Sequence, residues 1–245
     1  MLDALTATEA SMLNDVERMR AISHNLANVS TAGFKREMIV SRPFTQYLNL
    51  AAPGSMPASA FTVTQPQPAA FTDHRVGTLK FTANPLDVAM EGNGYFTVMG
   101  ESGPLYTRQG NFHLDAQGRL VTASGLPVLG KDGEIRLNTP QPVIDSDGNV
   151  FEGEQMVAQL QVAGFPEPDS LIGLGQGLYS ASEARAPEQT DLIRVRQGYL
   201  EASNVALTDE MIRMIETVRH FESSQRVLQS YDSMLDKSIN IIGEF

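Results

Sequence analysis

The sequence predicts an α+β protein, with long helices at both ends of the chain and a central all-β domain of many short strands. Two observations support the helices. Residues 3–28 and 199–242 contain no glycine or proline, and both ranges carry apolar residues at helical spacing. A third observation supports the strands, because from residue 76 onward short apolar runs alternate with Asp-Gly and Asn-Gly pairs, which are typical of hairpin turns.

The N-terminal range is predicted to form one amphipathic helix. Its apolar stripe consists of residues that recur every seven positions: Leu5, Met12, Met19 and Leu26. The stripe is widened by three further residues: Val16, Ile22 and Val29. Charged residues cover much of the remaining surface. A helix of this kind buries its apolar stripe against a partner while its opposite side faces water.

The C-terminal range carries a longer and more regular pattern. Six consecutive heptad positions are apolar: Leu207, Met214, Phe221, Leu228, Leu235 and Ile242. A straight helix over residues 199–242 would be about 65 Å long at about 1.5 Å per residue. Heptads sustained over this length favour coiled-coil packing against another helix. Because the N-terminal stripe is shorter, pairing the two helices would leave apolar surface for neighbouring subunits.

Four segments follow one another along the chain. We expect residues 1–38 to contain the N-terminal helix. Residues 39–75 are predicted to form an extended linker, because residues 51–70 are rich in proline and carry no charge. Residues 76–195 are predicted to form the β domain, with hairpin motifs such as GNGYFTV and KDGEIRL. Residues 196–245 are expected to form the C-terminal helix, which completes the helical domain.

The composition excludes several classes of function. With 29 acidic and 18 basic residues the net charge is −11, which argues against nucleic acid as a partner because phosphate binding needs clustered Lys and Arg. The absence of cysteine excludes disulfides and thiolate chemistry. No stretch approaches the roughly 18 apolar residues of a membrane-spanning helix, so we expect no membrane insertion.

No pattern indicates catalysis, a cofactor or a metal site, so we predict a protein that is not an enzyme and carries no cofactor. The histidines at positions 24, 74, 113 and 220 form no i, i+4 pair. Asp145, Asp147 and Asn149 resemble part of a calcium loop. Val150 and Met156, however, occupy the places that need glycine and glutamate, so a β-turn is the simpler interpretation.

The first helix ends in an unusual pattern, NLANVSTAGFKRE at residues 25–37. The amide side chains of Asn25 and Asn28 are suited to satisfy backbone groups that a helix leaves unpaired at its end. Gly33 permits a positive φ at the point where the chain leaves the helix. We therefore expect these residues to form a joint that directs the outgoing chain.

The three residues after this glycine suggest how the joint serves assembly. We expect Phe34 to anchor the outgoing chain on a neighbouring subunit. Lys35 and Arg36 are expected to stay solvated or to pair with acidic residues of that neighbour. An ordinary helix cap inside one monomer is the alternative. Together with the heptad residues of both helices, Asn25, Asn28, Gly33 and Phe34 make up the predicted assembly interface.

Four stretches of the chain resemble one protein family, in the order in which that family has them. They are residues 25–37, residues 84–98 (NPLDVAMEGNGYFTV), residues 106–130 (YTRQGNFHLDAQGRLVTASGLPVLG) and residues 197–235, which begin QGYLEASNVALTDEM. The family is that of the axial proteins of the bacterial flagellum, and within it the rod proteins of the basal body. The chain departs from the family at His24 and Ser30, where asparagine is common, and at Ala206, where asparagine or aspartate is frequent.

The resemblance implies a structural subunit of the flagellar rod, the drive shaft that crosses the periplasm and transmits torque from motor to hook. It implies a coiled-coil-like inner domain made by the paired terminal helices, with the β domain outside it. The implied partners are other copies of the chain, other rod and hook axial proteins, and the flagellar type III export apparatus. Export by that route fits an N-terminal sequence that does not resemble a cleaved signal peptide. The compact length favours a proximal-rod over a distal-rod protein.

Two other functions remain open on the residues alone. A coiled-coil adaptor could use the β domain to bind a separate ligand, and it would form a small closed oligomer. A hydrolase of cell-wall glycan would need two carboxylates in one cleft, roughly 5 to 9.5 Å apart, and no motif supplies such a pair.

Overall fold

The computed structural model describes residues 2–40, 69–168, 171–181 and 194–243. The chain divides into two compact units, and each is described by itself. The helical unit comprises Met1–Leu26, Glu37–Phe71 and Ala206–Phe245, and the β unit comprises Ala27–Arg36 and Thr72–Val205. Long helices near the chain ends and many short strands between them confirm the predicted α+β class.

The helical unit is built from two long helices and one small sheet. Its helices are α1 (Leu2–Ala27) and α3 (Leu207–Gly243), and its strands β1 (Glu37–Val40) and β2 (Ala69–Thr72) pair with each other. Asp209 and Glu210 lie in the first turn of α3, where negative charge interacts favourably with the helix dipole. The described residues contain no helix long and apolar enough to cross a lipid bilayer.

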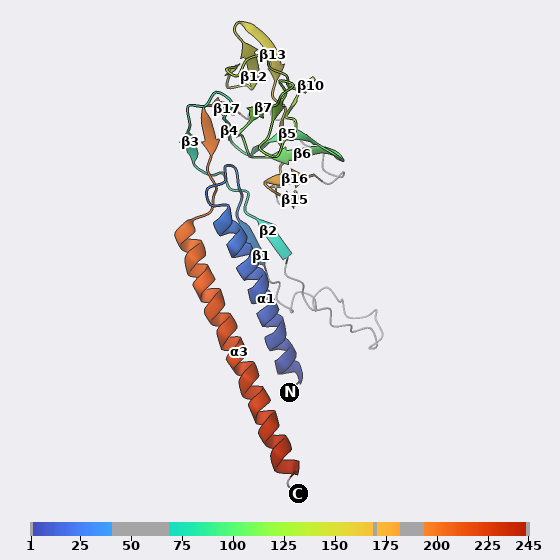
Figure 1. The fold of residues 1–245 in the computed structure, drawn as a ribbon, viewed down its shortest axis with the longest axis vertical. Coiled ribbons are helices and arrows are strands. Elements are labelled where there is room, and N and C mark those ends of the chain that lie inside the picture. Colours follow the sequence, from blue (N-terminus) through green and yellow to red (C-terminus); the bar gives the residue numbers. More distant parts are fainter. Residues whose placement is uncertain (1, 41–68, 169–170, 182–193, 244–245) are drawn as a thin grey trace. The chain divides into compact units, whose positions relative to one another are not determined.

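The helices α1 and α3 lie side by side and run in opposite directions (Figure 1). Nδ1 of His220 lies 2.6 Å from Oδ2 of Asp15. Nδ2 of Asn25 donates to Oε2 of Glu210 at 3.2 Å. Asn25 lies ten residues after Asp15 on α1, and Glu210 lies ten residues before His220 on α3. These equal and opposite steps define an antiparallel register over almost three turns of each helix.

The strands of the β unit form several small antiparallel sheets. The largest has the order β14-β5-β6-β16-β15 and consists of β5 (Gly94–Gly100), β6 (Gly103–Thr107), β14 (Val162–Gly164), β15 (Ile172–Gly175) and β16 (Leu178–Ser180). A three-stranded sheet contains β11 (Val143–Ile144), β12 (Asn149–Glu152) and β13 (Gln155–Gln159). The remaining strands form pairs: β3 (Leu79–Phe81) with β18 (Tyr199–Glu201), β4 (Val88–Glu91) with β17 (Arg194–Gln197), β7 (His113–Leu114) with β8 (Leu120–Val121), and β9 (Leu129–Gly130) with β10 (Gly133–Glu134).

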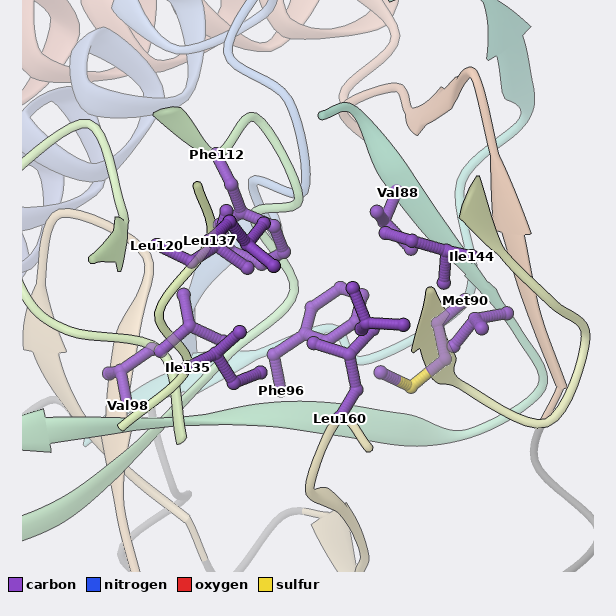
Figure 2. Close-up of a cluster of buried hydrophobic side chains, with 13 residues drawn as sticks. Val88, Met90, Phe96, Val98, Phe112, Leu120, Ile135, Leu137, Ile144 and Leu160 are labelled. Carbon is purple, nitrogen blue, oxygen red and sulfur yellow. The ribbon is translucent and has the colours of Figure 1, made fainter. Parts of the chain in front are cut away.

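Two clusters of buried side chains form the core of the β unit, and strand β5 contributes to both. Phe96 and Val98 belong to the larger cluster, shown in Figure 2, in which most side chains are aliphatic. Tyr95, which directly precedes Phe96 on β5, belongs to a smaller cluster that includes Tyr106 and Phe165. Successive side chains of a strand point to opposite faces, so one strand can supply two cores. The β unit therefore has an apolar interior of its own.

The C-terminal helix begins at Leu207, which is later than the sequence predicted. Residues 194–201 form β17 and β18 instead, and these strands pair with β4 and β3. The range 196–245 is therefore not helical throughout, and its first ten residues belong to the β unit. Most of the predicted linker lies outside the described residues, and the segments that flank the undescribed part pair as β1 and β2.

Candidate assembly interface

The joint at the end of α1 includes a buried asparagine that is fully used within its own chain. Asn25 donates to the backbone carbonyl of Glu37 and accepts from the backbone N–H of Glu37, both at 2.8 Å. This pair of bonds mimics a strand contact and fastens the start of β1 to the end of the helix. Asn25 also donates to Glu210 on α3. One side chain therefore connects α1, α3 and β1 inside the helical unit.

The loop that follows α1 belongs to the β unit. Thr31 donates from its hydroxyl to Oδ1 of Asn28 at 3.1 Å, and the backbone N–H of Thr31 donates to the carbonyl of Asn28. Gly33 has a φ of +66°, which confirms the predicted left-handed conformation. Its N–H donates to the carbonyl of Glu201 at 2.7 Å. The turn is thus attached to strand β18, far away in the sequence.

Gly33 is required by space as well as by its φ. A Cβ at this position would lie 2.5 Å from the backbone carbon and oxygen of Arg108. Real Cβ atoms do not approach backbone atoms so closely, and a neighbouring backbone cannot move aside as a flexible side chain can. Asparagine, which tolerates a positive φ better than other residues, therefore gains little at this position.

A buried ion cluster lies next to this turn. Nζ of Lys35 lies 2.5 Å from Oε1 of Glu201, and Nη1 of Arg108 lies 3.2 Å from Oε2 of the same carboxylate. All three side chains are at most 1% exposed. Lys35 also donates to the carbonyl of Arg75, and Glu201 accepts from the backbone N–H of Gly77. Charges this deeply buried are stable only when they are paired in this way.

The electrostatics of the cluster reflect its burial. Desolvation lowers the pKa of Lys35, and the charge and hydrogen bond of Glu201 oppose that shift. Nearby, a hydrogen bond from the Arg75 side chain holds the pKa of Asp73 below its usual value. Asn204 completes the neighbourhood, because it accepts from the N–H of Arg36 and donates to the carbonyl of Asp73, each at 2.8 Å.

Two expectations for the residues after Gly33 are wrong. Phe34 is only 5% exposed, so its ring packs within its own chain and is not available to anchor on a neighbour. Lys35 is neither solvated nor paired with another subunit, because Glu201 of the same chain binds it. The alternative of a cap inside one monomer describes these two residues correctly. The sequence gives no local sign of the partners Arg108 and Glu201, which approach from distant segments.

The predicted heptad residues fall into three groups. Those that are partly buried are Met12, Met19, Leu26, Met214, Phe221 and Leu228. Leu5 and Leu207 are exposed. Leu235 and Ile242 lie on the α3 backbone, but their side chains lie outside the described residues. The partly buried members of α3 recur every seven residues, which places them on one side of that helix.

A second set of apolar residues on α3 is exposed. It consists of Leu207, Met211, Ile212 and Ile215, which are between 49% and 53% exposed, and we call it the α3 stripe. On α1, Leu13 and Val16 are exposed as well. Leu207, Met211 and Ile215 follow one another at intervals of four, a spacing that the heptad count partly overlooked. Contiguous exposed apolar residues of this kind mark an interaction surface.

Several polar residues considered for chemistry contact other side chains or backbone groups of the chain. His24 lies 3.0 Å from Glu37, and His74 lies 2.7 Å from the hydroxyl of Tyr95. Asp145 accepts from the backbone N–H groups of Asp147 and Asn149, as expected for the turn between β11 and β12. Within the described ranges, no three His, Asp or Glu residues come together in a group that could hold a metal ion.

Comparisons with known proteins agree with one another. Residues 89–152 match the model of the flagellar hook protein FlgE/F/G D1 domain, and residues 196–241 match that of the flagellar basal body rod FlgEFG protein C-terminal region. The flagellar basal-body rod protein FlgG of Bacillus subtilis is 31% identical, over 98% of this chain and 99% of the relative. FlgF of Caulobacter vibrioides is 31% identical, over 91% of each chain. FlgG of Buchnera aphidicola from Acyrthosiphon pisum is 33% identical, over 95% of each.

All three named relatives cover at least 91% of the chain, so the match includes residues of both the helical unit and the β unit. The two family models independently cover much of the β unit and most of α3. The chain therefore belongs to the family of flagellar basal-body rod proteins that contains FlgF and FlgG.

Proposed function

We propose that this chain is a structural subunit of the flagellar basal-body rod, and that it assembles through its terminal helices. Its partners are other copies of itself and other axial proteins of the rod and hook. Membership of the rod protein family supports the first part of this proposal. The exposed α3 stripe supports the second part, and it is the observation on which the assembly argument rests.

The α3 stripe is costly to leave in water. Burying a whole aliphatic side chain stabilises an assembly by about 1.5 to 3 kcal/mol. Leu207, Met211, Ile212 and Ile215 are each about half exposed, so covering them together contributes several kcal/mol in one interface. A neighbouring helix is a suitable cover, because the spacing of the stripe matches the ridges of a second helix.

The partly buried side of α3 has a separate role in this proposal. Met214, Phe221 and Leu228 recur every seven residues, so they suit coiled-coil-like packing within an inner domain. The α3 stripe then remains available for other subunits. A rod built from many lengthwise helices resists twisting because each helix packs against several neighbours. Torque is transmitted by this packing, without catalysis.

The same proposal includes the route and the location of the protein. We place the subunit in the rod that crosses the periplasm, and we infer export by the flagellar type III apparatus. Within the family we propose the proximal-rod protein, FlgF, with FlgG as the alternative. Expression of this chain in strains that lack FlgF or FlgG tests this assignment, and we expect motility to return only in the strain without FlgF.

The assembly surface is tested by Ile215→Asp, which places a charge in the α3 stripe. Since Ile215 is already exposed in the single chain, the free energy of unfolding is expected to change by less than about 0.5 kcal/mol. Rod assembly and swimming are expected to be lost. Ser223→Asp is the matched control, because Ser223 is an exposed polar residue of the same helix. Normal swimming of the Ile215→Asp strain would show that the stripe is not an assembly surface.

A further inference from the structure

The α3 stripe contains one residue whose chemistry differs from that of its neighbours. Met211 is 52% exposed, and its side chain carries a thioether sulfur. The other stripe residues, Leu207, Ile212 and Ile215, have hydrocarbon side chains. The sequence contains no cysteine and no tryptophan, so the methionine thioethers are its most readily oxidised groups. An oxidant that reaches α3 therefore meets a reactive atom within the surface proposed for assembly.

The methionines of the chain differ widely in their exposure. Within the described residues the exposed ones are Met99, Met156, Met211 and Met234, at between 41% and 56%. Met90 lies in the larger core cluster of the β unit and is 1% exposed. An oxidant must touch the sulfur atom in order to react with it. In the single chain Met211 is therefore open to oxidation, and Met90 is protected from it.

Met234 provides a comparison on the same helix. It is 56% exposed, close to the value of Met211. It lies 23 residues further along α3, which is about 140° around the helix axis at about 3.6 residues per turn. Met211, in contrast, has Leu207 and Ile215 four positions before and after it, on the same side of the helix. Among the exposed methionines of α3, Met211 is thus the one that lies in the stripe.

We propose that Met211 is an oxidation site that controls whether the α3 stripe can be buried, with a peroxide as the oxidant. The thioether sulfur attacks one oxygen of hydrogen peroxide, and the O–O bond breaks. The proton of the attacked oxygen moves to the leaving hydroxide, which departs as water. The sulfur is oxidised to a sulfoxide, and the peroxide is reduced. This inference rests on the proposed function, because it concerns the regulation of the same surface.

The sulfoxide makes the stripe locally polar. Its oxygen is a strong hydrogen-bond acceptor, whereas the thioether sulfur is a weak one. In the unassembled chain water satisfies the new acceptor, so α3 keeps its structure. In an interface the same oxygen meets apolar side chains. Burying a polar group without a hydrogen-bond partner lowers an association constant by at least about fivefold.

The unassembled and the assembled chain differ in their sensitivity under this proposal. Once a neighbour covers the stripe, the sulfur of Met211 no longer contacts solvent. Oxidation thus excludes chains that are not yet assembled and spares those already in a rod. The change is reversible, because methionine sulfoxide reductases remove the oxygen as water while two thiols supply the electrons.

Peptide mass spectrometry after a timed exposure to hydrogen peroxide tests the accessibility of the sulfur. In the purified full chain we expect Met211 and Met234 to gain oxygen much faster than Met90. In isolated basal bodies that contain the chain, we expect Met211 to react more slowly than in the free chain. The inference is wrong if Met211 reacts as slowly as Met90 in the free chain, or equally fast in the free chain and in basal bodies.

Two substitutions test the effect on assembly. Met211→Gln imitates the polar sulfoxide permanently, and Met211→Leu removes the sulfur. Methionine, glutamine and leucine have similar helix propensities, so both variants keep α3 helical. We expect the amount of Met211→Gln in basal bodies to fall at least about fivefold. Met234→Gln is the matched control, because it places the same polar group on another side of α3, and we expect no loss from it.

A pulse of hydrogen peroxide during rod assembly connects the two measurements. We expect the pulse to lower the incorporation of the unchanged chain into basal bodies more than that of Met211→Leu. Cells that express Met234→Leu are the control and should respond to the pulse like the unchanged chain. An equal response of all three chains would show that oxidation of Met211 does not regulate assembly.

The variant Ile215→Asp separates this inference from the proposed function. If Met211→Gln assembles normally and Ile215→Asp does not, the stripe is an assembly surface that Met211 does not control. If both variants assemble normally, the stripe is not an assembly surface, and the proposed mode of assembly fails as well. An equal loss from Met211→Gln and Met234→Gln would contradict the particular role of Met211.

Discussion

The helical unit and the β unit are stabilised in different ways. In the described part of the helical unit the buried apolar residues are Ala21 and Ile22, whereas the buried polar residues are Asp15, Asn25 and Glu210. The β unit buries two clusters of large apolar side chains. Polar contacts thus fix the register of α1 and α3, while most of their apolar surface stays partly or wholly exposed. The β unit buries its large apolar side chains within a single chain, whereas Leu207, Met211 and Ile215 of α3 stay about half exposed.

The strongest way to break the β unit is to remove the carboxylate at the centre of its buried ion cluster. Glu201→Gln leaves Lys35 and Arg108 without their counter-charge. Removing one partner of a buried pair costs about 3 to 5 kcal/mol. We expect a loss of this size in denaturant unfolding, followed by tyrosine fluorescence. Glu154→Gln, at an exposed position, serves as the control and is expected to leave the unfolding midpoint unchanged.

Substitution of Gly33 is expected to have the next largest effect. A left-handed φ costs a β-branched residue about 1 to 3 kcal/mol, and any Cβ here also meets the backbone of Arg108. We expect Gly33→Ala, Gly33→Asn and Gly33→Val all to lower the melting temperature of the β unit, to which this residue belongs. Gly153→Asn is the control, because its φ of +64° is close to that of Gly33 and nothing lies within 4 Å of its Cβ position. Similar melting of Gly33→Asn and the unchanged chain would contradict the close approach.

A smaller effect is expected in the helical unit. Phe221 is partly buried, so Phe221→Ala should cost about 2 kcal/mol, less than the 3 to 5 kcal/mol of a fully buried phenylalanine. The loss should appear as faster amide exchange in α1 and α3, with no change in the β unit. If the β unit lost protection as well, the two units would not be as independent as their separate cores indicate.

The smallest expected effect is a dependence on pH at alkaline values. Burial lowers the pKa of Lys35 below its unfolded value of 10.5. Between the two pKa values the unfolded chain binds more protons, so this residue makes the free energy of unfolding rise with pH up to about 10.5. Lys35→Met lacks this contribution. Tyr106, whose pKa burial raises, contributes to both chains. The difference between the two chains should therefore grow with pH in this window, and a constant difference would contradict the shift.

The elements that follow from local patterns were predictable. The spacing of Leu5 to Leu26 indicated α1, and the turn residues of the middle segment indicated strands. The strand β17 had a signal too, since Arg194 to Gln197 alternate charged or polar residues with a buried valine, and Gly198 follows. The absence of glycine and proline over residues 199–242 indicated a continuous helix, and the prediction gave this pattern more weight. The helix was therefore predicted to start too early, at residue 196 instead of Leu207.

The ion cluster could not be predicted from local sequence. Lys35 and Glu201 are separated by 166 residues, and Arg108 comes from a third segment. A lysine followed by an arginine is usually solvated, and only the fold shows that one of them is enclosed. The positive φ of Gly33 was predictable from its place after a helix. The approach of the Arg108 backbone depends on tertiary structure, and it changes which substitutions are tolerated.

The same cluster determines how the β unit responds to pulling. The chain passes between the units near residues 26, 36, 72 and 205, and the last three crossings lie beside the cluster. Beside these crossings, Arg36, Asp73 and Asn204 are joined by hydrogen bonds, and Lys35 and Glu201 by an ion pair. Tension that enters at residue 36, 72 or 205 is shared with the other two of these crossings through these bonds. The ends of the β unit are therefore held to one another by side chains, and not only by the sheets between them.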